Sequence, residues 1–161
     1  MIHAGIVGTE ELRAKLDQTG PRVKLELHRA MLRATLELKV HIQTKKLSGQ
    51  VLKRGHGNLY DSITARVIEN GSQVIGIVGT NVVYARIHEY GGRTKPHLIT
   101  ARQAMALRFE GRDGKMVFRK TVHHPGSNMP MRSFLRSSLV DLKAQIIREL
   151  NAAVQRGLNR Q

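Results

Sequence analysis

The sequence predicts an α+β fold, in which a small antiparallel sheet of about four strands is flanked by two long helices. Apolar residues recur at helical steps of three and four over residues 21–44, and again over residues 133–158. Between these stretches the pattern changes to the two-residue alternation that is typical of strands. A length of 161 residues fits one domain, 1–161, with a core of its own.

Start and stop residues delimit the predicted helices. Thr9 and Glu10 open a short helix, because a hydroxyl and an acid both suit a helix N-terminus, and Gly20 is predicted to end it. Pro21 is well placed to begin the first long helix. Ser133 is predicted to cap the last helix with its hydroxyl. So long an amphipathic helix needs a sheet or a neighbouring subunit to cover its apolar stripe.

A hairpin is predicted directly after the first long helix. Its outgoing strand begins at Ile63, and residues 69–72 supply an Asn-Gly turn before a return strand over residues 73–79. A second hairpin is favoured around a turn at residues 111–114. The sequence therefore predicts about four strands in all.

The remaining segments are predicted to be a short helix and loops. Residues 81–90 are typical of a short helical turn, which Gly91 can end in a left-handed conformation. Residues 45–57 and 91–97 are expected to be flexible loops, and residues 123–130 a rigid one.

The composition points to an anionic partner. The chain has 27 Lys and Arg against 12 Asp and Glu, a net charge of +15, which favours contact with nucleic acid, acidic protein surfaces or anionic lipid. The absence of Cys excludes disulfides and thiolate metal sites. We expect no signal peptide at the N-terminus and no membrane partner, because no apolar stretch approaches the roughly 18 residues of a span.

No pattern of catalytic or metal-binding residues stands out. His88 and Glu89 do not begin a zinc-protease motif, because Gly92 stands where the second His is needed. His123 and His124 are adjacent, so on a strand they would point to opposite faces and chelate poorly. We expect no enzymatic activity, no metal site and no cofactor.

Three short motifs are less generic. Residues 57–63 read Gly-Asn-Leu-Tyr-Asp-Ser-Ile, residues 78–92 read Val-Gly-Thr-Asn-Val-Val-Tyr-Ala-Arg-Ile-His-Glu-Tyr-Gly-Gly, and residues 129–136 read Met-Pro-Met-Arg-Ser-Phe-Leu-Arg. In this order and spacing they resemble the phage tail-component and virion-morphogenesis family. The resemblance covers about residues 35–145 and departs from the family at Met131 (usually Ala) and Ser133 (usually Pro).

The resemblance implies a structural subunit of a tailed-phage virion, assembled in the host cytoplasm and acting at the head–tail interface. Tail completion, head–tail joining and tail termination all remain open. Such subunits are expected to form a ring, as a homo-oligomer with six copies the expected number, around the DNA channel. Their neighbours would be connector or stopper proteins, the tail tube protein, and packaged DNA in the lumen. The alternative is a sequence-independent nucleic-acid-binding protein.

Two sets of residues are the candidate sites. The first is large or polar side chains of the second and third motifs, which are expected either in the core or in a subunit interface: Tyr84, Ile87, His88, Glu89, Tyr90, Pro130, Phe134 and Leu135. The second is basic residues expected to face DNA or an acidic ring: Arg93, Lys95, Arg102 and Arg108.

Overall fold

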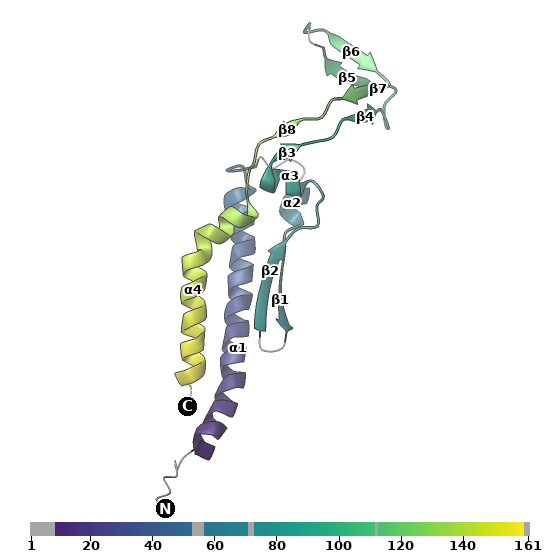
Figure 1. Ribbon diagram of the computed structural model, residues 1–161. Coiled ribbons are helices and arrows are strands. Elements are labelled where there is room, and N and C mark those ends of the chain that lie inside the picture. Colours follow the sequence, from purple (N-terminus) through teal and green to yellow (C-terminus); the bar gives the residue numbers. More distant parts are fainter. Residues whose placement is uncertain (1–8, 53–56, 71–72, 112, 160–161) are drawn as a thin grey trace, which may run out of the picture. The chain divides into compact units, whose positions relative to one another are not determined.

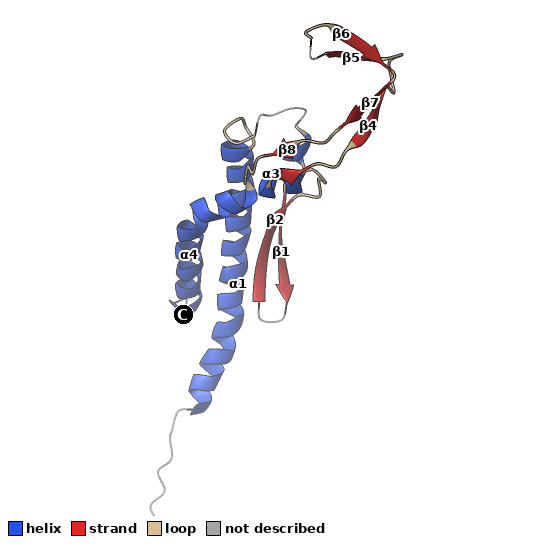
Figure 2. Ribbon diagram, turned by 45° about the horizontal axis from the view of Figure 1, so that its top comes forward, coloured by secondary structure: helices blue, strands red, loops and turns tan. Residues whose placement is uncertain are grey.

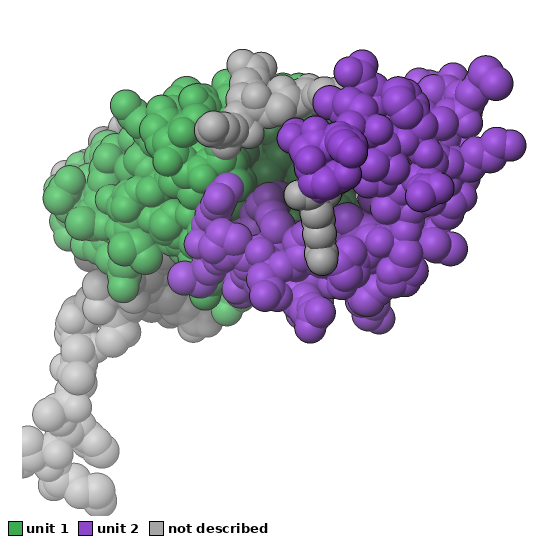
Figure 3. Space-filling model, turned by 90° about the horizontal axis from the view of Figure 1, so that it is seen from above, with its two compact units in different colours: residues 1–85, 133–161 green, residues 86–132 purple. Residues whose placement is uncertain are grey.

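The computed structural model describes residues 9–52, 57–70, 73–111 and 113–159, with side chains from residue 19 onward (Figures 1 and 2). The chain divides into two compact units, which are coloured separately in Figure 3. Unit 1 is Met1–Ala85 with Ser133–Gln161, and unit 2 is Arg86–Arg132. The predicted α+β class is confirmed. The single domain over 1–161 stays a prediction, because two compact units can belong to one domain.

Unit 1 is built on two long helices that pack side by side (Figures 1 and 2). Helix α1 spans Thr9–His41 and continues as a π-helical turn, η1, over Ile42–Lys46. Helix α4 spans Leu135–Asn159 and packs along α1. None of the described helices is long and apolar enough to cross a bilayer.

The prediction of a separate short helix ending at Gly20 is wrong, because α1 runs through Gly20 and Pro21 without interruption. A proline inside a helix costs about 3 kcal/mol, since it removes one hydrogen bond and crowds the preceding turn. The residues after Pro21 pack against α4, with Val23 lying against Gly157. Tertiary contact of this kind overrides the local preference to break the helix.

The start of α4 confirms the predicted cap. The hydroxyl of Ser133 accepts a hydrogen bond from the backbone N–H of Ser137 at 3.2 Å. The Ser137 hydroxyl donates back to the Ser133 carbonyl at 2.7 Å. The N-terminal turn of α4 therefore has a partner for one of its otherwise unpaired N–H groups.

Polar pairs connect the two helices at both ends. Lys46 Nζ and His41 Nε2 both reach the Asp141 carboxylate, at 2.7 and 3.1 Å. These hydrogen bonds, from Lys46 first and then His41, lower the pKa of Asp141. Near the other end, Arg156 Nε lies 3.3 Å from the nearly buried carboxylate of Glu26. The pairs set how α4 is aligned along α1.

Gly157 allows the closest approach of the two helices. A Cβ at this position would lie 2.6 Å from Val23 Cα and 3.0 Å from Val23 N, which are backbone atoms that cannot rotate away. We therefore expect Gly157→Ala to lower the free energy of unfolding by about 1–3 kcal/mol, as overpacking does. By helix propensity alone the same change would stabilise the protein by up to about 1 kcal/mol. Urea unfolding followed by circular dichroism gives the sign.

The matched control for Gly157→Ala is Asn151→Ala. Asn151 is an exposed residue of the same helix, and its change should shift the free energy of unfolding by less than about 0.5 kcal/mol. A Gly157→Ala protein more stable than wild type would contradict the close approach.

The first predicted hairpin is confirmed. Strands β1 (Thr64–Asn70) and β2 (Gln73–Gly79) pair antiparallel from Thr64↔Gly79 to Asn70↔Gln73. Residues 71 and 72 of the predicted turn lie outside the described residues, and Glu69 belongs to β1 rather than to the turn.

The hairpin packs on a different side of α1 from α4 (Figures 1 and 2). Lys24 Nζ and His28 Nδ1 each lie 2.7 Å from the Glu69 carboxylate, and these hydrogen bonds lower its pKa. Gly76 comes so close to Thr35 and Met31 that a side chain there would collide with them. α1 is therefore covered on two sides.

The core of unit 1 lies where α1, α4 and the hairpin meet. Ile42, Ile63 and Phe134 are fully buried, and they are joined by Leu47, Leu52 and Ala85. Helix α2 (Asn58–Asp61) adds Leu59 and Tyr60 at the edge. The flexibility predicted for residues 45–57 stays a prediction, and residues 53–56 lie outside the described part.

Unit 2 is a ribbon of short antiparallel strands. It begins within helix α3 (Ala85–Tyr90), which ends at Gly91 with φ of +69°, as predicted. Three pairs of strands nest inside one another along the chain: β3 (Gly92–Arg93) with β8 (Asn128–Met129), β4 (His97–Thr100) with β7 (Thr121–His124), and β5 (Leu107–Glu110) with β6 (Met116–Arg119).

The predicted sheet of about four strands is therefore corrected. In the described residues the strands form four separate two-stranded pairs, because nested pairs lengthen a ribbon instead of widening a sheet. The second predicted hairpin is confirmed in β5 and β6, although residue 112 of its turn is not described. The loop predicted over residues 123–130 is wrong in part, because His123 and His124 belong to β7 and pair with β4. Flexibility of residues 91–97 stays a prediction.

Candidate assembly surfaces

The candidate contact residues are divided between the two units. In unit 1, Phe134 is fully buried, Leu135 packs against the core, and Tyr84 is exposed. Phe134 is thus a core residue, which was one of the two predicted roles. In unit 2, Tyr90 and Pro130 are exposed, Ile87 and His88 are half-buried, and Glu89 is buried. An interface role for the exposed members stays a prediction.

His88 makes a backbone hydrogen bond within unit 2, and its side chain is half-buried. Its backbone carbonyl accepts a hydrogen bond of 2.7 Å from the N–H of Arg132, which joins the two ends of unit 2. Burial, and then the nearby positive charge of Arg132, lowers the pKa of His88. The lowered pKa of His88 favours the neutral form of its imidazole.

The histidines of the ribbon do not make a metal centre in the described residues. His97 and His124 lie opposite each other on β4 and β7, and their rings stack with centroids 5.0 Å apart. His123 pairs with Leu98 and so points to the other face. The described residues contain no group of three His, Asp or Glu side chains that could hold a metal ion.

Some apolar side chains of α1 remain half exposed. Four large aliphatic side chains of α1 are 45–55% exposed: Leu25, Leu32, Leu36 and Val40. We refer to these four residues as the α1 ridge. The apolar periodicity of the sequence includes them in a broad helical stripe, and the structure leaves each of them about half exposed, with Leu36 bordering a hollow that α4 also lines.

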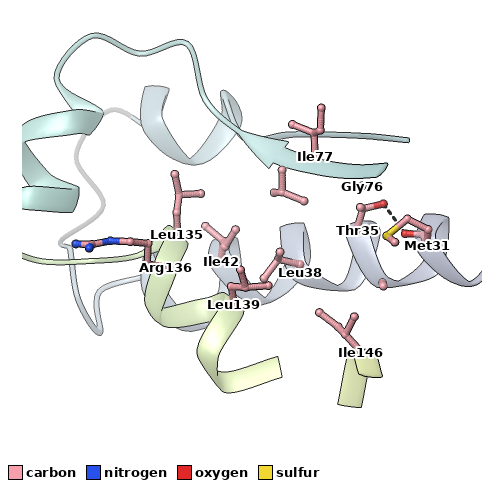
Figure 4. A pocket seen from close by; sticks show the side chains of 12 residues that line it. Met31, Thr35, Leu38, Ile42, Gly76, Ile77, Leu135, Arg136, Leu139 and Ile146 are labelled. Atoms are coloured by element: carbon pink, nitrogen blue, oxygen red, sulfur yellow. Dashed lines mark hydrogen bonds between the residues drawn. The ribbon is translucent and has the colours of Figure 1, made fainter. Parts of the chain in front are cut away.

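A groove lies where α1, β2 and α4 meet (Figure 4). Its volume is about 360 Å³ and its lining is almost entirely apolar, with Leu38, Ile42 and Leu139 beside one another and Ile146 further along. Arg136 is the one charged side chain in the lining. We refer to this feature as the α1–α4–β2 groove. Leu139 is half exposed there, so the groove is open to a partner.

The ribbon carries much of the positive charge. Unit 2 has ten Lys and Arg against three Asp and Glu in its 47 residues. The four predicted basic candidates, Arg93, Lys95, Arg102 and Arg108, are all exposed. Sequence reasoning did not place the accompanying apolar side chains among the candidate sites, although Leu-Arg-Phe-Glu over residues 107–110 and Met-Val-Phe-Arg over residues 116–119 signal them.

An α+β chain with half-exposed apolar side chains on a long helix, an open apolar groove and a basic ribbon has the surfaces of an assembly protein. The model of the phage virion morphogenesis family matches residues 33–155, and the chain belongs to this family. It is therefore a bacteriophage virion morphogenesis protein of the tail, a structural class, and the resemblance noted in its motifs is confirmed. Neither a curated protein nor a solved structure matches the chain.

Proposed function

We propose that this protein is a structural subunit at the head–tail interface of a tailed phage, acting in tail completion, head–tail joining or tail termination. In this proposal, copies of the chain close into a ring around the DNA channel. The observation that carries it is the α1 ridge, a row of four aliphatic side chains that the fold leaves half exposed.

The ridge can contribute to a subunit contact. Full burial of a Leu or Val side chain is worth about 1.5–3 kcal/mol, so covering the exposed half of four such residues is worth roughly 3–6 kcal/mol. From Leu25 to Val40 the ridge extends roughly 22 Å along the helix. Rows of this kind are typical of helices that pack against a neighbour.

A closed ring needs two different surfaces on each subunit, because every copy binds the next one head to tail. The ridge is half exposed and the α1–α4–β2 groove is hollowed, and both are apolar. The groove follows α1 from Met31 to Ile42, roughly 16 Å, which accommodates most of the ridge of a neighbour. We therefore propose that the ridge of one copy binds the groove of the next.

The positive charge supports the other proposed partners. A net charge of +15 favours contact with packaged DNA in the lumen and with acidic rings in the particle. The proposed protein neighbours are the connector or stopper proteins and the tail tube protein, and six copies is the proposed ring number.

Native mass spectrometry and negative-stain electron microscopy test the proposal. We expect the purified chain to form a closed ring, either alone or after addition of purified connectors and tail tubes from the same phage. A chain that stays monomeric in every one of these mixtures would contradict the proposed function.

The second candidate function is a sequence-independent nucleic-acid-binding protein, which the same net charge favours. Its binding to duplex DNA would fall steeply with salt, by roughly 10³-fold or more between 50 and 200 mM for six or more phosphate contacts. Weak or salt-insensitive DNA binding together with ring formation would decide for the structural subunit.

A further inference from the structure

We infer that one face of the β5–β6 hairpin binds an acidic protein neighbour in the virion. The face consists of Arg108, Glu110, Met116 and Phe118, and we refer to it as the Phe118 face. This inference rests on the proposed function, because it names the chemistry of one neighbour of the ring subunit.

The register of the hairpin puts these four side chains on one face. Arg108 lies opposite Phe118 and Glu110 lies opposite Met116, and residues that are directly opposite in a ladder share a face. Phe118 is 62% exposed and Met116 is 53% exposed. The face is therefore largely open to solvent.

The reverse face of the same hairpin is more covered. It pairs Leu107 with Arg119 and Phe109 with Val117. Leu107 and Val117 are half-buried, and Phe109 is 38% exposed. The two faces thus carry the same kinds of residue, an arginine and a phenylalanine, but only one presents its aromatic ring openly.

The ribbon has no hydrophobic core of its own. No apolar side chain in the described residues of unit 2 is buried, whereas Leu98, Met105, Met116 and Phe118 are all more than half exposed. A two-stranded hairpin is marginally stable in water without a further layer. Covering the Phe118 face with a partner would supply that layer.

The charge of the chain argues that this partner is not a second copy. Unit 2 has ten basic and three acidic residues, and the rest of the chain has 17 basic and nine acidic ones. Neither unit offers an excess of acids to face Arg108. Both parts of the chain thus have a net positive charge, 10 − 3 = +7 for unit 2 and 17 − 9 = +8 for the rest, so the ribbon is complementary in charge to an acidic molecule and not to another copy.

The same face favours protein over DNA. Phe118 and Met116 gain free energy only when apolar atoms cover them, and a phosphate backbone offers few. Glu110 stands on this face too, and its carboxylate needs a hydrogen-bond donor or a basic group, which a protein surface can offer and a phosphate backbone cannot. A net-acidic protein surface that also has an apolar pocket and a donor group for Glu110 can contact the aromatic ring, the guanidinium and the carboxylate together.

The test uses the full chain and three defined probes: a random copolymer of Glu and Tyr, poly-Glu of the same length, and a 30-base-pair DNA duplex. Dissociation constants are measured by fluorescence anisotropy. The wild type should bind the copolymer about tenfold more tightly than poly-Glu, and Phe118→Ala should remove this preference, as expected when an aromatic anchor is truncated.

The two arginines of the hairpin are a matched pair. Arg108→Glu should weaken binding of the copolymer about tenfold, whereas Arg119→Glu, the same charge reversal on the reverse face, should weaken it less than about threefold. Equal effects of the two reversals, equal binding of copolymer and poly-Glu, or tighter binding of the duplex would each overturn the inference.

Ring formation is a separate readout. A protein that forms rings but shows no dependence on the Phe118 face contradicts this inference and leaves the proposed function standing. A protein whose probe binding depends on the Phe118 face but which forms no ring in any mixture contradicts the proposed function and leaves this inference standing.

Discussion

Phe134→Ala should lower the free energy of unfolding by about 3–5 kcal/mol, the usual cost of removing a buried phenylalanine. Phe134 is fully buried and is the largest side chain of the core, where it contributes to the same cluster as Ile42 of η1 and Ile63 before β1. Its loss would leave a cavity where the two helices and the hairpin meet. Since the free energy of unfolding of a domain of this size is about 5–15 kcal/mol, the substitution would remove a large part of it.

Urea unfolding of Phe134→Ala and of a control, Val140→Ala, measures this effect. Val140 lies on the same helix and is 72% exposed, so its change should cost less than about 0.5 kcal/mol. A loss below about 1 kcal/mol for Phe134→Ala would mean that the motif around Phe134 does not support the core.

Leu32→Glu on the α1 ridge and Leu139→Glu in the α1–α4–β2 groove should each abolish ring formation under conditions where the wild type assembles. Both side chains are about half exposed in the subunit, so a glutamate can be solvated there and the fold should survive. In the assembled ring the same carboxylate would be buried against apolar atoms, which costs several kcal/mol.

Mixing the two variants tests the head-to-tail arrangement. The Leu139→Glu protein keeps its ridge and the Leu32→Glu protein keeps its groove, so one of each should pair once and then stop. Native mass spectrometry of a 1:1 mixture should show heterodimers and no rings. If the ridge instead bound the ridge of another copy, the groove variant alone would dimerise and mixing would give no new species.

Leu158→Glu is the control for these two variants. Leu158 is also half exposed on α4, and it belongs to neither the ridge nor the groove. The Leu158→Glu protein should assemble into rings of the same mass and in the same yield as the wild type. Loss of the ring in this variant would show that added negative charge, and not the position, prevents assembly.

The local elements that were predicted correctly depend on chemistry within a few residues. The Asn-Gly pair and the alternation around it correctly predicted β1 and β2. The Ser133 hydroxyl correctly predicted the start of α4. Gly91 ended α3 because only glycine accepts its positive φ without strain. By contrast, the helix break at Pro21 was wrong, since packing of the residues that follow it on α4 keeps α1 continuous.

By itself the sequence determined the class of fold, the positions of most elements and the family, because period, turn residues and motif spacing are properties of the chain alone. The tertiary structure decided which apolar residues of α1 are covered: Ala34 is buried while Leu36, two residues on, is half exposed. It also decided that the later strands pair as a nested ribbon with an open Phe118 face. Burial depends on which element packs against a residue, and that partner lies far away in the sequence.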